Sequence, residues 1–150
     1  MSQQHDCIFC QIIDGKLLAN RLYEDQRAIV ILDLLPIHQG HTLIIPRHHG
    51  ALLEQHDEAT SAHLMVLARR VIAAHKAAGL PLAAHNLVVN DGKAANQHVP
   101  HVHLHVIPRG HGDTLLTIMR WWTRMLPWTS MAKRRLHLAP LAQRLRPHLA

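Results

Sequence analysis

The sequence predicts an α+β fold, in which a five-stranded antiparallel sheet is covered by one long helix. Five short β-rich runs are separated by turn residues, and a single long segment has the apolar periodicity of an amphipathic helix. The chain has 150 residues, of which 48% are hydrophobic, enough to bury the core of one domain.

Local patterns predict a short first helix and the five strands. Residues 7–13 are expected to form a helix that ends near Gly15. The expected strands are residues 21–24, 28–32, 42–45, 87–89 and 102–107. The polar pair Asp25-Gln26 separates the first two strands, and Pro36 and Gly40 mark the loop before the third.

The long helix is predicted over residues 57–78. Asp57 and Glu58 favour its N-terminus through the helix dipole, and Gly79 and Pro81 end it. One apolar stripe is expected to pack on the sheet, and it consists of Leu64, Leu67, Ala68, Val71 and Ala74.

The positive charge is confined to the C-terminal segment. Residues 1–110 hold nine Lys/Arg and nine Asp/Glu, whereas residues 111–150 hold seven Lys/Arg and one acid, Asp113, which accounts for the net charge of +6. The body is neutral and aromatic residues make up only 3% of the whole chain, which argues against specific nucleic-acid binding. No apolar run is long enough to span a membrane, and the start of the chain lacks the pattern of a secretory signal. Two cysteines are too few for a disulfide framework, and we expect a cytoplasmic protein.

The most informative segment is His101-Val102-His103-Leu104-His105, in a chain with 16 histidines. On a strand, alternate side chains share a face, so the three histidines would point one way and the apolar residues into the core. Neutral imidazole is a nucleophile whose charge changes near physiological pH, so this row suits phosphoryl chemistry. A solvated strand face or a metal-binding face would give the same pattern.

The loop before this segment is the second informative feature. Asn90-Asp91-Gly92 ends the preceding strand, and the loop continues to Gln97. Its backbone N–H groups and the amides of Asn90 and Gln97 are suited to binding an anion. An ordinary turn between two strands would also account for the Asn-Asp-Gly sequence.

Together these residues resemble the histidine triad (HIT) family, whose hallmark is His-φ-His-φ-His-φ-φ with φ apolar. Residues 101–107 match it, and further blocks agree in order over about the first 110 residues. These blocks are residues 7–10, 31–33, 40–47, 90–92 with Gln97, and 106–109. The pair Cys7 and Cys10 is similar to that of the CxxC-containing bacterial-type branch, which is related to the Hint and Fhit nucleotide hydrolases.

The resemblance implies a covalent mechanism. His103 would attack the α-phosphorus of a nucleoside phosphoramidate or dinucleoside polyphosphate and form a nucleotidyl-histidine, which water or another acceptor then releases. His105 would contact the phosphate and stabilise its developing charge. The resemblance also implies the substrate-binding residues, which are Asp33 for the ribose, Leu32 and Leu34 with Ile31 for the base, and Asn90 and Gln97 for the phosphate oxygens.

Cys7 and Cys10 have the spacing of half a zinc site. The pair is also similar to that of the galactose-phosphate uridylyltransferases. This resemblance implies that His49 and His101 are the other two ligands, in a closed structural site. His48 or His98 would be alternative ligands, and two packed thiols without metal would also fit the spacing.

The sequence departs from the family pattern in the loop. Asn96-Gln97-His98 stands where the family has Gly-Gln-Ser or Gly-Gln-Thr, which changes the backbone near the phosphate and leaves the leaving-group preference open. His98 would serve there as an acid or simply as bulk. Pro100 cannot donate to a ladder, so the strand is expected to be unpaired at that point.

We divide the chain into a HIT domain, residues 1–110, and a basic, partly helical extension, residues 111–150. The extension begins with an apolar cluster of Trp121, Trp122, Met125 and Leu126. It continues with leucines at helical spacing, Leu138, Leu141, Leu145 and Leu149, interrupted by Pro140 and Pro147. This tail would pack back on the domain, lie on an anionic surface, or give a Trp to a partner subunit, because HIT proteins usually form homodimers through the long helix and an edge strand.

Three other functions fit the sequence. A nucleotidyl transferase would use the same histidine with a phosphorylated acceptor. A nucleotide-binding or zinc-stabilised scaffold without catalysis would explain the changed loop. A histidine-rich metal binder would hold several weakly bound ions.

Overall fold

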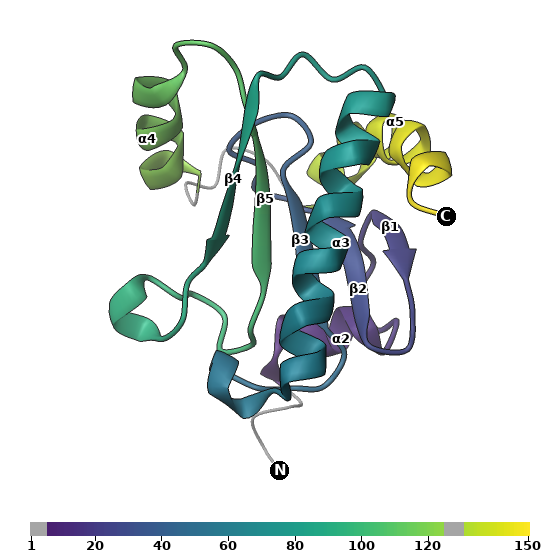
Figure 1. Ribbon diagram of the computed structural model, residues 1–150, viewed down its shortest axis with the longest axis vertical. Coiled ribbons are helices and arrows are strands. Elements are labelled where there is room, and N and C mark those ends of the chain that lie inside the picture. The colour runs from purple at the N-terminus through teal and green to yellow at the C-terminus, as the bar shows by residue number, and fades with distance from the viewer. Residues whose placement is uncertain (1–5, 125–130) are drawn as a thin grey trace.

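The computed structural model describes residues 6–124 and 131–150. Its centre is a five-stranded sheet in the order β1-β2-β3-β5-β4, in which every neighbouring pair is antiparallel (Figure 1). The strands are β1 (Arg21–Glu24), β2 (Ala28–Leu32), β3 (Thr42–Pro46), β4 (Ala84–Val89) and β5 (Leu104–Arg109). The predicted α+β fold with its antiparallel sheet is confirmed.

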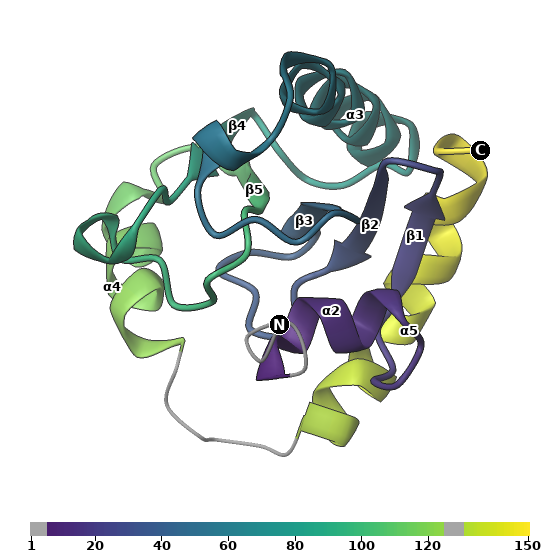
Figure 2. The same cartoon turned by 90° about the horizontal axis from the view of Figure 1, so that it is seen from below.

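The helices lie around this sheet. They are α2 (Ile8–Ile13), α3 (Glu58–Ala77), α4 (Thr114–Thr123) and α5 (Met131–Leu145), with short 3-10 turns at Leu53–Gln55, Lys93–Ala95 and Arg146–His148. Figure 2 shows α3 and α2 on opposite faces of the sheet, α4 on the side of β4 and β5, and α5 beside β1.

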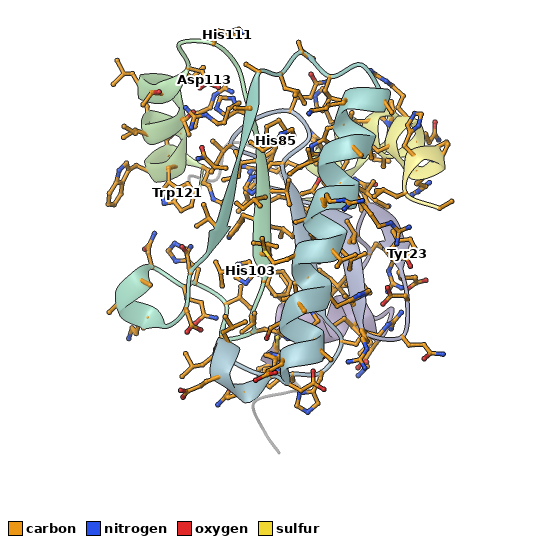
Figure 3. All side chains as sticks on the ribbon, viewed as in Figure 1. Tyr23, His85, His103, His111, Asp113 and Trp121 are labelled. Carbon is orange, nitrogen blue, oxygen red and sulfur yellow. The ribbon has the colours of Figure 1, made fainter. Side chains whose placement is uncertain are left out.

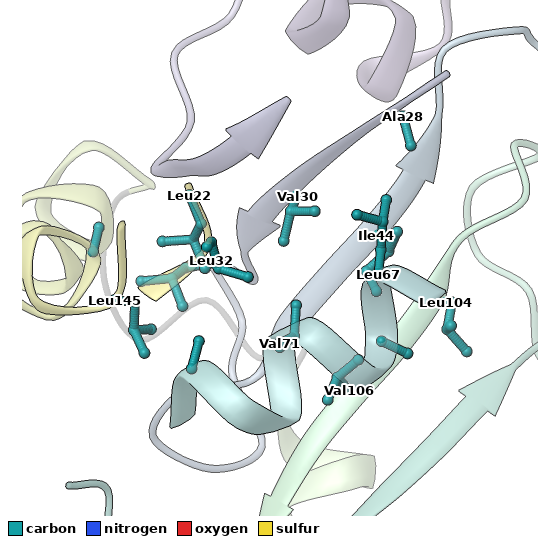
Figure 4. Packing of buried hydrophobic residues seen from close by; sticks show 14 of the residues in the cluster. Leu22, Ala28, Val30, Leu32, Ile44, Leu67, Val71, Leu104, Val106 and Leu145 are labelled. Carbon is teal, nitrogen blue, oxygen red and sulfur yellow. The ribbon is translucent and has the colours of Figure 1, made fainter. Parts of the chain in front are cut away.

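The face of the sheet under α3 carries the larger apolar cluster. All five predicted stripe residues of α3 are buried, and they meet Val30 and Leu32 of β2, Ile44 of β3 and Leu104 of β5 (Figure 4). The Asp57 side chain caps α3 by accepting a hydrogen bond from the backbone N–H of Thr60 at 2.6 Å. The stripe thus orients the helix as the sequence predicted, and the Asp57 cap adds a hydrogen bond to the predicted interaction with the helix dipole.

The opposite face of the sheet is covered by α2. Phe9 and Ile12 pack against the intervening residues of β2 and β3, namely Ile29, Ile31, Leu43 and Ile45. These two strands are therefore buried on both faces, which explains why they are continuous apolar runs and not alternating ones. The triad histidines face this same side.

Two strands begin at residues that differ from the predicted ones. Strand β4 begins at Ala84, three residues earlier, and β5 begins at Leu104, two residues later. Before Leu104 the backbone bonds outside the sheet ladder, because His101 N–H donates to the Val99 carbonyl and Val102 N–H donates to the Gly50 carbonyl, both at 2.8 Å. Pro100 lies outside the strand, as expected.

The C-terminal extension packs back on the body. Its leucines at helical spacing are buried in the same cluster as the sheet residues, and Leu145 and Leu149 are at most 1% exposed. Pro140 lies inside α5 and does not interrupt it, because this packing holds the helix together. Met125 and Leu126 lie outside the described residues. Within the described chain, no helix combines the length and apolar character that crossing a bilayer requires.

Candidate functional site

A cavity of about 140 Å³ opens on the α2 side of the sheet, next to the triad histidines. Its lining includes seven of the residues predicted to act on substrate, Ile31, Asp33, Leu34, Asn90, His98, His103 and His105. The lining residues that were not predicted to bind substrate include Phe9, Asn96, Trp121 and Arg124. Segments far apart in the sequence thus meet at one place.

His103 is held in one orientation and one tautomer. Its Nδ1 donates to the backbone carbonyl of His101 at 2.8 Å, because a carbonyl can only accept. Nε2 is therefore the nitrogen with the free lone pair. The ring packs edge-on against Phe9, with centroids 4.9 Å apart. Burial lowers the pKa of His103, which keeps the imidazole neutral, as a nucleophile must be.

His105 is oriented by a histidine that the sequence analysis did not predict, His41. Nε2 of His41 lies 3.0 Å from Nδ1 of His105, and both rings are buried. The backbone N–H of Ile37 donates to Nδ1 of His41 at 3.2 Å, so the ring proton of His41 is on Nε2; the Asp33 carboxylate, 3.4 Å from that Nδ1, is the more distant neighbour. His41 therefore donates to His105, and the proton of His105 is on Nε2.

Burial also fixes the charge of these two rings. It lowers the pKa of His41 to about 4, and burial together with the nearby His41 moves the pKa of His105 far below its usual value. Both rings are neutral near pH 7. The ring of His103 lies beside them, and its centroid is 4.7 Å from that of the His105 ring. The site thus presents a neutral nitrogen nucleophile beside a fixed N–H donor.

Asp33 is the acidic group of the cavity, and the C-terminal extension binds it. Nη1 of Arg124 donates to Oδ2 of Asp33 at 3.0 Å, while Oδ1 accepts the backbone N–H of Leu35 at 2.8 Å. Both side chains are largely buried, so the ion pair is shielded from solvent. Sequence patterns gave no signal for this contact, since Arg124 lies 91 residues from Asp33.

Helix α4 brings Trp121 to the same place. The indole ring lies 6.2 Å from the His105 ring, centroid to centroid, and lines the cavity of its own chain. Figure 3 labels Trp121 on this helix. Polar contacts attach α4 to the body, because Arg109 binds Asp113 at 2.6 Å and His38 bonds to Thr117 at 2.7 Å. Trp122, in contrast, is exposed.

The loop with the unusual sequence keeps a glycine-like backbone. Asn96 has φ 66° and ψ 32°, the left-handed region that glycine adopts freely and that asparagine tolerates. The Gln97 amide does not line the cavity. It accepts from the Gly92 N–H at 3.0 Å and donates to the Ala51 carbonyl at 2.8 Å, so it holds the loop against the chain before α3.

Leu32 is not part of the cavity. It is 1% exposed and belongs to the cluster under α3, whereas Ile31, Asp33 and Leu34 line the cavity. The reason is the alternation of β2, in which Ile31 and Leu32 point to opposite faces of the sheet. The prediction that Leu32 lines this pocket is therefore wrong, and the apolar lining from this part of the sheet is Ile31, Leu34 and Leu43.

A second group of side chains meets at the start of α2. Cys7, Cys10, His49 and His101 each offer one ligand atom, and these atoms all lie within 4.8 Å of one another. Cys10 Sγ is 3.3 Å from His49 Nδ1, Cys7 Sγ is 3.5 Å from His101 Nδ1, and the two Nδ1 atoms are 3.3 Å apart. His48 instead packs against His56, and His98 lines the cavity next to the triad histidines.

This group fits a tetrahedral zinc ion. Zn–S bonds of about 2.3 Å and Zn–N bonds of about 2.0–2.1 Å place neighbouring ligand atoms roughly 3.3–3.8 Å apart. Nε2 of His101 donates to the Pro46 carbonyl at 2.8 Å, which leaves Nδ1 free to ligate. Burial and the adjacent Cys7 raise the pKa of Cys10 to about 11, so a thiolate here requires a cation.

Comparison with known proteins agrees with these observations. The sequence profile of the HIT domain matches residues 15–112. An uncharacterized HIT-like protein of Mycobacterium tuberculosis is 42% identical over 73% of this chain and 75% of its own length. The adenosine 5′-monophosphoramidase HNT1 of Saccharomyces cerevisiae is 39% identical over 69% of this chain and 62% of its own length. The adenylylsulfatase HINT3 of Arabidopsis thaliana is 41% identical over 75% of this chain and 56% of its own length.

Among solved structures, a zinc-bound histidine triad family protein from Mycobacterium smegmatis superposes with a TM-score of 0.77 at 35% identity, covering 97% of this chain and 94% of the other. The profile match covers well over half of the chain, and it contains His41, Asn90 and the whole triad segment. The chain belongs to the histidine triad family.

Proposed function

We propose that this protein is a nucleotide hydrolase that cleaves at the α-phosphate of a nucleoside phosphoramidate or dinucleoside polyphosphate through His103. The observation that carries the proposal is the fixed tautomer of His103, whose free Nε2 lies in a cavity beside the N–H donor His105. Two relatives named for adenosine 5′-monophosphoramidase and adenylylsulfatase activity support cleavage next to an adenylyl group.

The reaction takes two steps. The Nε2 lone pair of His103 forms a bond to the α-phosphorus, and the bond to the leaving group breaks with its electron pair; a phosphate departs as its anion, and an amine departs with a proton taken up from solvent. Water then forms a P–O bond and gives up one proton to solvent, while the N–P electron pair returns to Nε2. This releases the nucleoside monophosphate and restores neutral His103. The N–H of His105 donates to a phosphoryl oxygen, and this bond strengthens as negative charge develops there.

The rest of the cavity would position the nucleotide. Asp33 would accept hydrogen bonds from the ribose hydroxyls, and Ile31, Leu34 and Leu43 would contact the base. Asn90 and the backbone around Asn96 lie where phosphate oxygens would be held, and His98 lies at the rim of the same cavity. Gln97 would act on phosphate indirectly, by holding the loop in place.

We further propose that zinc binds Cys7, Cys10, His49 and His101 in a structural role. The ion would tie α2 to the segment that carries His103, and all four protein ligands leave no open position for substrate. The chain would also form a homodimer, with an interface made by the exposed apolar residues Met65 and Val66 of α3 and by the edge strand β4.

The small number of cysteines is consistent with a location in the reducing cytoplasm.

Release of AMP from adenosine 5′-phosphoramidate and from diadenosine tetraphosphate tests the hydrolase. The wild type is expected to release AMP from at least one of them, and His103→Ala to lose more than about 1000-fold in kcat. His63→Ala is the matched control, because His63 of α3 bonds to Asp25 at 2.8 Å and does not line the cavity. Undiminished turnover by His103→Ala would refute the proposal.

A further inference from the structure

A second and larger cavity adjoins the catalytic one. It has a volume of about 660 Å³ and lies between the loop after β2, the last turn of α4 and the first turns of α5. This size is typical of a small-molecule site, where pockets measure about 300–1,000 Å³. The proposed reaction at His103 does not use it.

The lining of this cavity, called here the basic groove, is strongly cationic. It contains Arg120, Arg124, Lys133 and Arg134, together with His137. Four of the seven Lys/Arg in residues 111–150 thus line one cavity. No acidic side chain lines it, within the part of the chain that the structure describes. The excess charge of the extension is therefore concentrated where an anion would be bound.

The basic groove meets the catalytic cavity at one end only. Leu34, Leu35 and Arg124 line both. Asn90 and His103, which mark the phosphate end of the catalytic cavity, line only that cavity. The shared residues adjoin Asp33, to which Arg124 is bonded at 3.0 Å. A nucleotide whose α-phosphate lies at His103 would therefore reach the groove from its ribose.

We infer that the basic groove binds a phosphate carried on the 2′ or 3′ hydroxyl of the substrate's ribose, so that the preferred substrates are ribose-phosphorylated nucleotides. This inference rests on the proposed function, because the orientation of the nucleotide comes from His103 and Asp33. Ribose hydroxyls at Asp33 place their substituents directly at Arg124. An arginine guanidinium binds phosphate with two parallel hydrogen bonds, and Lys133 and Arg134 supply further charge.

When such a nucleotide binds, Arg124 and Asp33 would each exchange their ion-pair partner for a group of the ligand. Without ligand, Arg124 neutralises the largely buried carboxylate of Asp33. With ligand, a ribose hydroxyl donates to Asp33 and the guanidinium turns to the added phosphate. Both buried charges keep a partner throughout, as their burial requires. A nucleotide with an unsubstituted ribose would displace Arg124 without offering it a replacement.

Calorimetric binding of four adenine nucleotides to the zinc-loaded full chain tests the inference. AMP is the reference, adenosine 3′,5′-bisphosphate and its 2′,5′ isomer carry the second phosphate on the ribose, and ADP carries it on the 5′ side. We expect one of the bisphosphates to bind at least tenfold more tightly than both AMP and ADP. Arg134→Glu should abolish this preference with little effect on AMP. Lys133→Glu, at an exposed side chain, provides a second variant.

Arg135→Glu is the matched control, since it changes the same charge at the next residue of α5 and does not line the groove. This variant should prefer the bisphosphate over AMP and ADP as strongly as the wild type does. If AMP binds and neither bisphosphate binds more tightly, the inference fails while the proposed function stands. If the affinity of ADP exceeds that of AMP by more than the affinities of the bisphosphates do, the groove faces the leaving group and the inference is wrong. If AMP does not bind at all, the nucleotide site itself fails.

Discussion

His41 and His105 form a hydrogen bond between two buried imidazoles, Nε2 to Nδ1, at 3.0 Å. This bond directs the remaining N–H of His105 away from His41, towards the cavity. We predict that His41→Leu, which cannot donate, lowers kcat about 10- to 100-fold with little change in KM. His41→Gln, which keeps a donor, should recover part of the loss.

Steady-state kinetics on both variants, with thermal unfolding to confirm that they fold, checks this prediction. His63→Ala is the control, because its histidine is bonded to Asp25 at 2.8 Å and lies outside the cavity. Equal rates for His41→Leu and His41→Gln would show that the hydrogen bond does not matter for catalysis, and that His41 only fills space.

The Cys7, Cys10, His49 and His101 cluster predicts one tightly bound zinc per chain. Cys10→Ser should lower the zinc content measured by elemental mass spectrometry to near zero. It should also lower the melting temperature by about 10 °C or more, since binding of a structural ion contributes directly to folding. His48→Ala, next to His49 but packed against His56, should leave zinc content unchanged. Zinc-free wild type of full stability would contradict the site.

His75 predicts a loss of stability in acid. The ring is fully buried between Thr42 of β3 and His85 of β4, with His41 nearby, and burial lowers its pKa to about 4. The unfolded chain takes up this proton near pH 6.5 and the folded chain only near pH 4. Between these values the unfolded state binds more protons, so the free energy of unfolding falls as the pH falls, by up to about 3 kcal/mol.

Urea unfolding of the wild type and of His75→Gln between pH 7.5 and 4 measures this contribution. The difference in free energy between them should shrink as the pH decreases through this window. His148→Gln, at an exposed histidine, should follow the wild type at every pH. A His75→Gln curve parallel to that of the wild type would show that His75 does not titrate abnormally.

The exposed apolar pair on α3 predicts the oligomeric state. Met65 and Val66 are 53% and 56% exposed on the helix that covers the sheet. We expect a homodimer by light scattering, and we expect Val66→Glu to convert it to a monomer, because a buried unpaired carboxylate is costly. Leu136→Glu on α5, at a residue 64% exposed, should remain dimeric. A dimeric Val66→Glu protein would place the interface elsewhere.

The sequence predicted those parts of the fold and site that depend on neighbouring residues. The α3 stripe and the common face of His103 and His105 follow from periodicity, which chain geometry enforces. The two buried strands follow from short apolar runs bounded by turn residues. The CxxC spacing and the family blocks likewise predicted four side chains that the fold brings together.

The missed features depend on contacts between distant segments. His41 precedes β3 by one residue, and only the pairing of Leu43 with His105 places it beside the triad. Its position two residues before Leu43, on the same face of the strand, was the available signal. Arg124 and Trp121 come from the extension, whose path no local pattern specifies. Pro140 was expected to interrupt α5, but tertiary packing of the leucines outweighs the local cost.

The covalent intermediate on His103 is the central claim, and intact-mass spectrometry after a rapid, acid-free quench tests it most directly. Wild type mixed with adenosine 5′-phosphoramidate or diadenosine tetraphosphate should gain the mass of one adenylyl group, and His103→Ala should gain none. An adduct of the same mass on His103→Ala, or AMP release by wild type with no adduct at any mixing time, would contradict the account.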